Sequence, residues 1–189
     1  MKLAVLVSGQ GSLLAAIRDH GIDISLVVAD RDCSAIHTAR RHGIQAELVV
    51  RKNFTSTFET DRPFYTKQMQ KVLKMYGIEM VVMAGFMTIL SPEFFEHFEN
   101  RVLNCHPALL PNFKGSHAVQ KTLAAGVDWT GSTVHVAVAE VDSGPILAQS
   151  RVRIFARDTE ETLKRRLKLR EYNLYPQTIK KYLAQIKNP

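Results

Sequence analysis

Short, almost uniformly apolar runs alternate with amphipathic stretches from the beginning of the chain. Segments such as Val5–Val7 and Leu26–Ala29 contain no polar residue, which is typical of parallel strands buried on both faces. Because parallel strands need a crossover connection, usually a helix, the alternation predicts βαβ units. The expected strands are 3–8, 25–30, 46–50, 80–85 and 101–106, and the expected helices are 12–20, 34–42, 63–76 and 92–98.

The pattern changes after residue 130. Two strand-like segments, 132–139 and 146–154, are separated only by a turn rich in Gly and Pro, which predicts an antiparallel pair. We find no repeat, linker or low-complexity tract. The sequence therefore predicts one α/β domain over residues 1–189, with a mostly parallel sheet, helices on both faces and an antiparallel strand pair near the C-terminus.

Two prolines set expected helix limits. Pro63 suits the first turn of a helix, where its missing N–H is not needed. Pro176 falls inside the last helical segment, where it would break or kink a helix. We therefore expect two helices there, 159–171 and 174–187, the first of them capped by Asp158-Thr159.

The net charge of +7 is concentrated at the C-terminal end. Residues 1–150 hold 14 Lys/Arg and 14 Asp/Glu, whereas residues 151–189 hold 11 and 4. A basic end can meet nucleic acid or a phosphorylated substrate. No aromatic residues interleave with the basic run, so we expect a solvated helix face and no nucleic-acid partner.

Cysteine content and hydropathy indicate the compartment. No apolar run approaches the length of a membrane span, so we expect no membrane association. Cys33 and Cys105 make no disulfide framework, which favours a reducing, cytoplasmic location. The Cys and His spacing matches no metal site, so we expect no metal.

Asn104 and His106 are the strongest candidates for chemistry. They end an apolar strand and, two residues apart, point to the same side of it. Pro107 has no N–H for the ladder and ends the strand. An amide can donate to a developing oxyanion, and an imidazole can carry a proton near neutral pH.

Other polar residues have a structural and a functional interpretation. Asp142 lies in a Gly/Pro turn, where a carboxylate either bonds its own backbone or orients an imidazole. His135, on a strand, and His117, at a helix start, are each more often structural. Spacing likewise favours core packing for Ile89 and Leu90, although their loop follows a parallel strand, where ligand sites form.

The loop Ser8–Ser12 follows the first strand and opens the first helix. Glycines there let the backbone approach a ligand, and free N–H groups at a helix start favour an anion. A monophosphate site and a structural turn both remain open. A dinucleotide site, with Asp30 on a ribose, is a third alternative, although Leu14 occupies the third glycine position.

Six segments together resemble the phosphoribosylglycinamide formyltransferases, the folate-dependent family of purine synthesis, over essentially the full chain. They are 8–12 (SGQGS), 84–92 (AGFMTILSP), 104–111 (NCHPALLP), 113–117 (FKGSH), 131–135 (GSTVH) and 142–145 (DSGP). The resemblance implies a Rossmann-like formyltransferase domain. Its N-terminal half would bind the phosphate of the nucleotide substrate, and its C-terminal half would bind folate.

Residue roles follow from the resemblance. It implies that Asn104, His106 and Asp142 are catalytic, with His117 and His135 in support. It implies ribonucleotide contacts at Gly11, Ser12, Leu13, Pro107 and Glu171. It implies folate contacts at Arg62, Met87, Thr88, Ile89, Leu90, Asn104, Val138, Ala139, Glu140, Val141 and Asp142.

Three positions depart from the family pattern. Leu13 stands where Asn is usual, Lys114 where Pro is usual and Ser143 where Gly is commoner. The first removes a side-chain donor from the phosphate loop. Lys114 would loosen its loop or add a cation near a phosphate or the folate tail, and Ser143 would alter the folate loop.

The implied reaction transfers a formyl group from 10-formyltetrahydrofolate, as co-substrate, to the primary amine of 5'-phosphoribosylglycinamide. The partners are then small molecules, with a homodimer left open. Alternatives are formyl transfer to an aminoacyl-tRNA or a nucleotide sugar, and hydrolysis of 10-formyltetrahydrofolate. A nucleotide-binding module without catalysis is the alternative from a different class.

Overall fold

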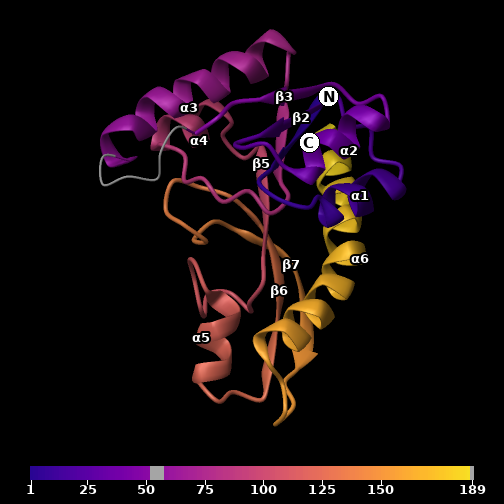
Figure 1. The fold of residues 1–189 in the computed structure, drawn as a ribbon, viewed down its shortest axis with the longest axis vertical. Helices are drawn as coiled ribbons and strands as arrows, with labels where there is room; N and C mark the ends of the chain where they lie inside the picture. Colours follow the sequence, from indigo (N-terminus) through magenta and orange to yellow (C-terminus); the bar gives the residue numbers. More distant parts are fainter. Residues whose placement is uncertain (52–57, 188–189) are drawn as a thin grey trace. The chain divides into compact units, whose positions relative to one another are not determined.

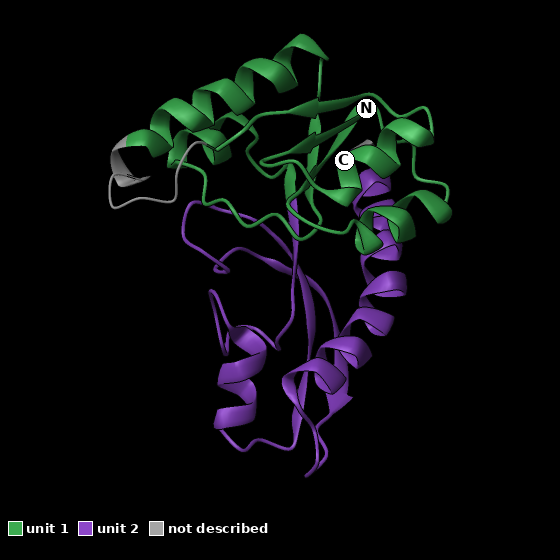
Figure 2. Ribbon diagram, in the orientation of Figure 1, with its two compact units in different colours: residues 1–102 green, residues 103–189 purple. Residues whose placement is uncertain are grey.

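The strands of the N-terminal half are parallel, as their apolar sequences predict. The computed structural model describes residues 1–51 and 58–187, and it comprises unit 1 (residues 1–102) and unit 2 (residues 103–189) (Figure 2). In unit 1 the strand order is β3-β2-β1-β4, with each adjacent pair parallel. These strands are β1 (Leu3–Val7), β2 (Leu26–Ala29), β3 (Ala46–Leu48) and β4 (Met80–Met83). Every residue of β1, β2 and β4 is buried, which confirms the predicted βαβ organisation.

Helices cover both faces of the unit 1 strands. Figure 1 shows α1 and α2 on one side and α3 and α4 on the other. Helix α2 packs on β2 and β3, and helix α3 packs on helix α4. Their bounds are α1 (Ser12–Asp19), α2 (Ser34–Arg41), α3 (Phe58–Met75) and α4 (Pro92–His97).

The placement of Pro63 in a first helical turn is wrong. The third helix already begins at Phe58, so Pro63 lies inside it. Proline cannot donate to the carbonyl four residues earlier, at the cost of one backbone hydrogen bond. The apolar stripe that continues the helix, Tyr65, Met69 and Leu73, is buried and stabilises it despite that loss.

Unit 2 is built on antiparallel pairing. The strands β5 (Val102–His106), β6 (Trp129–Val136) and β7 (Ile146–Arg153) pair in that order, and both pairings are antiparallel. A register shift at Val134/His135 leaves one extra residue on β7, which is a β-bulge. Helices α5 (Ala118–Ala124) and α6 (Glu160–Lys187) lie on opposite sides of these strands in Figure 1, and α6 packs on β6 and β7. The predicted antiparallel pair is confirmed.

The predicted break at Pro176 is wrong, because α6 is one helix from Glu160 to Lys187. Its packing explains why. Tyr175, the residue before Pro176, is fully buried. Its hydroxyl donates a hydrogen bond to the carbonyl of Leu103 at 2.8 Å. Buried Leu163, Leu167 and Ile179 extend the same contact along the helix. Within the described ranges, no helix combines the length and apolar character needed to cross a bilayer.

The expected cap of this helix is confirmed. The amide of Thr162 donates to Oγ1 of Thr159 at 3.2 Å, and the amide of Thr159 donates to Oγ1 of Thr162 at 2.9 Å. This reciprocal pair has the geometry of a capping box, with Thr in place of the usual acidic residue. Ser91 directly precedes α4, but its hydroxyl pairs with that of Thr66 at 3.0 Å instead of capping the helix.

Gly11 is required by both conformation and space. It precedes α1 with φ 80° and ψ 20°, the left-handed region that disfavours side chains. A Cβ at this position would lie 2.8 Å from Cβ of Ala35. The chain therefore turns from β1 into α1 with its backbone pressed against the start of α2.

We predict that Gly11→Ala lowers the free energy of unfolding by about 2–4 kcal/mol, the sum of left-handed strain and overpacking. Gly21→Ala is the matched control, because Gly21 has φ 70° but open space around it. It should cost only about 1 kcal/mol. Urea unfolding of both variants measures the difference, and equal losses would contradict the contact with Ala35.

Candidate active site

Asn104 and His106 project from one face of β5, as strand alternation predicts. The register places Asn104 opposite His135 and His106 opposite Thr133 on β6. Cys105 points to the other face, where burial and then the charge of Glu171 raise the pKa of its thiol well above the usual value. A neutral, buried thiol is a poor nucleophile, so the amide and the imidazole remain the candidates for chemistry on this strand.

Asp142 reaches this face from the loop between β6 and β7. It is 9% exposed and has φ 53°, in the left-handed region. This backbone conformation is unfavourable for a residue with a side chain, so contacts with neighbouring residues hold it. Gly144 makes the turn fit, because a Cβ there would lie 1.9 Å from the carbonyl oxygen of Val136. Oδ2 of Asp142 lies 3.1 Å from Nδ1 of His106 and accepts the amide of Gly115 at 2.8 Å.

Both ring nitrogens of His106 have partners. Nε2 lies 2.9 Å from the carbonyl oxygen of Phe113, and a carbonyl only accepts, so Nε2 carries hydrogen. Nδ1 then faces the carboxylate of Asp142, so a proton taken up by the ring lies between these two atoms. The ring is 5% exposed in total. The geometry therefore fixes the orientation of the imidazole and places its movable proton between Nδ1 and Asp142.

His135 joins the same cluster. Its Nδ1 lies 3.0 Å from the carbonyl oxygen of Val136, so that nitrogen carries hydrogen. Its Nε2 lies 3.3 Å from Nδ2 of Asn104 and 3.4 Å from Oδ1 of Asp142. Spacing alone favoured a purely structural role for His135, whereas these contacts link it to the amide and the carboxylate.

The electrostatics of the pair follow from burial and contacts. Burial lowers the pKa of His106 below its usual 6.5, and the nearby carboxylate of Asp142 offsets this only in part. Burial alone would raise the pKa of Asp142. Hydrogen bonds from His135 and from the Gly115 amide outweigh burial, so the pKa lies below its usual 3.8. The carboxylate is thus held as an anion.

The loop Gly85–Leu90, in unit 1, presents alternate side chains. Met87 and Ile89 are 70% and 48% exposed, whereas Thr88 and Leu90 are buried. The expected core packing is therefore confirmed for Leu90 and wrong for Ile89. The amide of Met87 donates to the hydroxyl of Ser8 at 2.8 Å, so this loop is tied to the glycine-rich loop.

Asp30 is already fully engaged, which removes the basis of the dinucleotide alternative. Oδ2 accepts the hydroxyl of Thr88 at 2.7 Å, and Oδ1 accepts Nε of Arg31 at 2.9 Å. The residue is 1% exposed. A ribose would have to displace buried partners, so this carboxylate braces the loops of unit 1.

The glycine-rich loop keeps the geometry needed for an anion. Gly11 precedes α1, and half-buried Ser12 and Leu13 are its first two residues. The first turn of this helix has no acidic residue and no side-chain cap, so its first amides point out of the helix end with no side-chain acceptor on them. Phosphate binding there stays a prediction.

The other residues singled out by the resemblance lie on several separate elements. Glu171 on α6 accepts the hydroxyl of Ser132 at 2.9 Å, on the face of the unit 2 strands opposite His106. His117 is exposed at the start of α5, Pro107 is half-buried after β5, and Arg62 is half-buried on α3. Val138 is half-buried, and the next three residues, Ala139, Glu140 and Val141, are exposed in the loop that leads to Asp142.

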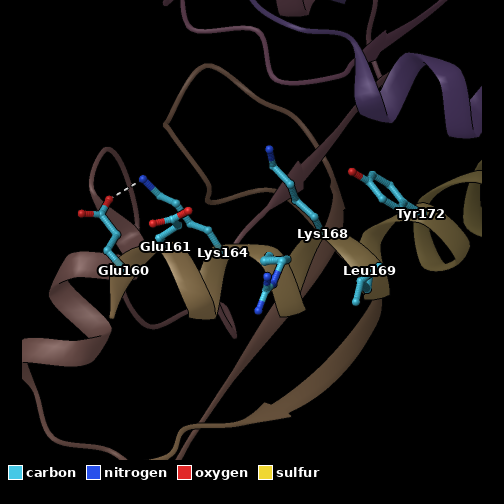
Figure 3. Close-up of a pocket in the computed structure, with 7 residues that line it drawn as sticks. Glu160, Glu161, Lys164, Lys168, Leu169 and Tyr172 are labelled. Carbon is cyan, nitrogen blue, oxygen red and sulfur yellow. Dashed lines mark hydrogen bonds and ion pairs between the residues drawn. The ribbon is translucent and has the colours of Figure 1, made fainter. Parts of the chain in front are cut away.

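The basic residues of α6 line an open hollow of about 550 Å³ (Figure 3). Figure 3 shows Lys164 turned toward Glu160, with which it forms an ion pair, and Lys168 and Tyr172 further along the helix. The two acidic side chains thus lie at the start of the helix, and the basic side chains follow them along this surface. Within the described residues, no three His, Cys, Asp or Glu side chains are placed to share a metal ion.

Two functional contacts escaped sequence reasoning, and both come from the backbone. The carbonyl of Phe113 receives His106, and the amide of Gly115 donates to Asp142. A backbone group carries no residue-type signal. The available hint is conformational, because Phe113 and Gly115 both have positive φ, of 56° and 77°, and glycine is a known marker of such turns.

The two lowered pKa values predict how stability depends on pH. In each case the folded state binds fewer protons than the unfolded chain, so stability rises with pH. The contribution of His106 is complete above its unfolded pKa of 6.5 and is lost as pH falls toward its lower folded value. That of Asp142 is complete above 3.8 and is lost as pH falls through its own folded value.

We therefore expect the stability difference between the wild type and Asp142→Asn to shrink as pH falls below 3.8, because the native carboxyl then becomes neutral too. Urea unfolding between pH 3 and 8 measures it. Asp128→Asn, at an exposed position, is the control and should show a small, constant difference. A gap for Asp142→Asn that stays constant down to the lowest pH would contradict the lowered pKa.

Comparison with known proteins agrees with this geometry. The Formyl transferase family matches residues 1–179. Phosphoribosylglycinamide formyltransferases of Mycobacterium tuberculosis and Haemophilus influenzae are 40% and 36% identical over 178 and 186 residues. The alignments cover 92% and 95% of this chain and 80% and 85% of the relatives. The crystal structure of phosphoribosylglycinamide formyltransferase from Bacillus halodurans has a TM-score of 0.89 at 31% identity, over 100% of this chain and 98% of that one. Both the sequence and the structure therefore show that this chain belongs to the formyl transferase family.

Proposed function

We propose that this chain transfers the formyl group of 10-formyltetrahydrofolate to the primary amine of 5'-phosphoribosylglycinamide. The observation that carries the proposal is the convergence of Asn104, His106 and Asp142 in one cluster of unit 2, with His106 and Asp142 3.1 Å apart. The relatives named for this reaction cover most of the chain and support the same acceptor. Soluble small molecules are then the substrates, and a cytoplasmic location fits a reaction of purine synthesis.

The chemistry requires a charge stabiliser and a proton carrier. The amine attacks the formyl carbon, a C–N bond forms, and the carbonyl oxygen becomes an oxyanion. An amide has two N–H groups, and the contacts of Nδ2 of Asn104 with described residues are long, at 3.3 Å to His135 and 3.5 Å to Asp142. It can therefore turn an N–H to the oxyanion that forms beside His106.

The proton then moves through the buried pair. The attacking amine gives up a proton to the pair formed by His106 and Asp142, whose shared position lies between Nδ1 and Oδ2. The same pair, through water, returns a proton to the folate nitrogen as the second C–N bond breaks. Formylglycinamide ribonucleotide and tetrahydrofolate then leave. One proton has left the amine and one has reached the folate nitrogen, and no covalent intermediate forms on the protein.

The remaining roles are assigned by the same proposal. The amides at Gly11, Ser12 and Leu13 bind the phosphate of the ribonucleotide, with Pro107 and Glu171 as further contacts. Arg62, the loop Met87–Leu90 and the loop Val138–Asp142 bind formylfolate. Exposed Met87 and Ile89 offer an apolar surface suited to a flat, aromatic ring system.

The direct test is release of tetrahydrofolate, followed spectrophotometrically, with and without the ribonucleotide. We expect production only when 5'-phosphoribosylglycinamide is present, with one formylated product per folate. Tetrahydrofolate production at the same rate with and without the ribonucleotide would indicate hydrolysis. No production with the ribonucleotide, and production with an initiator aminoacyl-tRNA or an amino nucleotide sugar, would indicate a different acceptor.

Separate His106→Ala and Asp142→Asn variants should lower kcat by about 10²–10⁴-fold, the range for loss of a positioned proton carrier. His42→Ala and Asp128→Asn, at exposed positions, are the matched controls and should retain turnover. Circular dichroism checks that all four variants are folded. Turnover at the wild-type level in either of the first two would remove this mechanism.

A further inference from the structure

Three consecutive residues, Phe113 to Gly115, contact the catalytic pair or its turn. The carbonyl of Phe113 holds His106 at 2.9 Å, and the amide of Gly115 holds Asp142 at 2.8 Å. Between them, Lys114 extends its side chain to the turn that bears Asp142. Its Nζ donates to the hydroxyl of Ser143 at 2.7 Å. Backbone and side chain of one short segment therefore converge on two adjacent residues of the same turn.

The contact between Lys114 and Ser143 is directed at both ends. Oγ of Ser143 accepts the lysine and donates to the carbonyl of Val141 at 3.1 Å, inside the turn. On the other side, Nζ of Lys121 on α5 donates to the carbonyl of Lys114 at 3.1 Å. A chain of hydrogen bonds thus runs from α5 through Lys114 into the Asp142 turn.

Competing partners of Lys114 are weaker. The nearest carboxylate oxygen, Oε1 of Glu140, lies 3.8 Å away, and that side chain is 79% exposed. An ion pair so exposed contributes little. Lys114 is itself 38% exposed and so has conformations in solvent available to it. Its position on Ser143 therefore reflects the short bond between an ammonium and a hydroxyl, which is stronger than a neutral one.

The turn needs such support. Asp142 has φ 53°, which disfavours a residue with a side chain, and its carboxylate is buried away from water. The carboxylate of Asp142 accepts a hydrogen bond from the amide of Gly115, in the Phe113–Gly115 segment. A shift of the turn would break both that bond and the contact of the carboxylate with His106. A second tie between the same two segments limits such a shift.

We propose that Lys114 and Ser143 are positioning residues, and that their hydrogen bond holds the Asp142 turn against the Phe113–Gly115 segment so that the carboxylate stays on His106. For the reaction itself, this inference rests on the proposed function. Their hydrogen bond joins the two segments without using an atom of the imidazole or of the carboxylate.

The test combines Lys114→Met, Ser143→Ala and the double variant. Each single variant should lower kcat by about tenfold, the size of one charge-assisted hydrogen bond. The double variant should fall no further, because both substitutions remove the same bond. The KM for the ribonucleotide should not change. Ser143→Thr keeps the hydroxyl, so its kcat should stay near that of the wild type and above that of Ser143→Ala. Lys180→Met, at an exposed position of α6, is the control for loss of a positive charge and should keep the wild-type kcat.

Hydrogen exchange of the Gly115 amide, followed by NMR, reports the same contact without any substrate. Its exchange should speed up by a similar factor in both single variants and no more in the double variant. If the wild type transfers no formyl group, the proposed function fails, and the exchange rates still decide whether the bond holds the turn. Unchanged exchange in Lys114→Met, or losses in the double variant equal to the product of the single ones, would overturn the inference.

Discussion

The candidate active site depends on one buried carboxylate. Asp142 is taken out of water in a backbone conformation that disfavours it, and it is kept there by the Gly115 amide and by His106 and His135. Burial alone would neutralise the acid, whereas these donors keep it ionised. Its charge in turn offsets part of the desolvation of His106. Without the carboxylate, the imidazole would be a buried base with a partner on only one nitrogen.

Local signals in the sequence were enough for the framework. Uniformly apolar runs identified the parallel strands, and the two-residue spacing of Asn104 and His106 placed both side chains on one face of β5. Asp158-Thr159 correctly predicted the start of α6. These features depend on neighbours within a few residues, and such information is present in a short stretch of sequence.

What escaped prediction depends on partners that are far away in the sequence. Pro176 does not end α6, because Tyr175 is anchored on Leu103, 72 residues earlier. The contacts of His106 and Asp142 with the Phe113–Gly115 segment use backbone atoms, and the residue type does not predict such contacts. Asp30 had the position of a ribose ligand, and only the structure reveals Thr88, 58 residues later, on its carboxylate.

The bulge at Val134/His135 has a consequence for how this protein can vary. On one side, His135 is paired in register with Asn104, so β6 is fixed relative to the face of β5 that carries Asn104 and His106. On the other side, the extra residue of β7 absorbs a mismatch in spacing. A residue added to or removed from the outer strand near the bulge would therefore leave His135 facing Asn104. The outermost strand of the sheet can thus tolerate insertions that the pairing of β5 with β6 cannot.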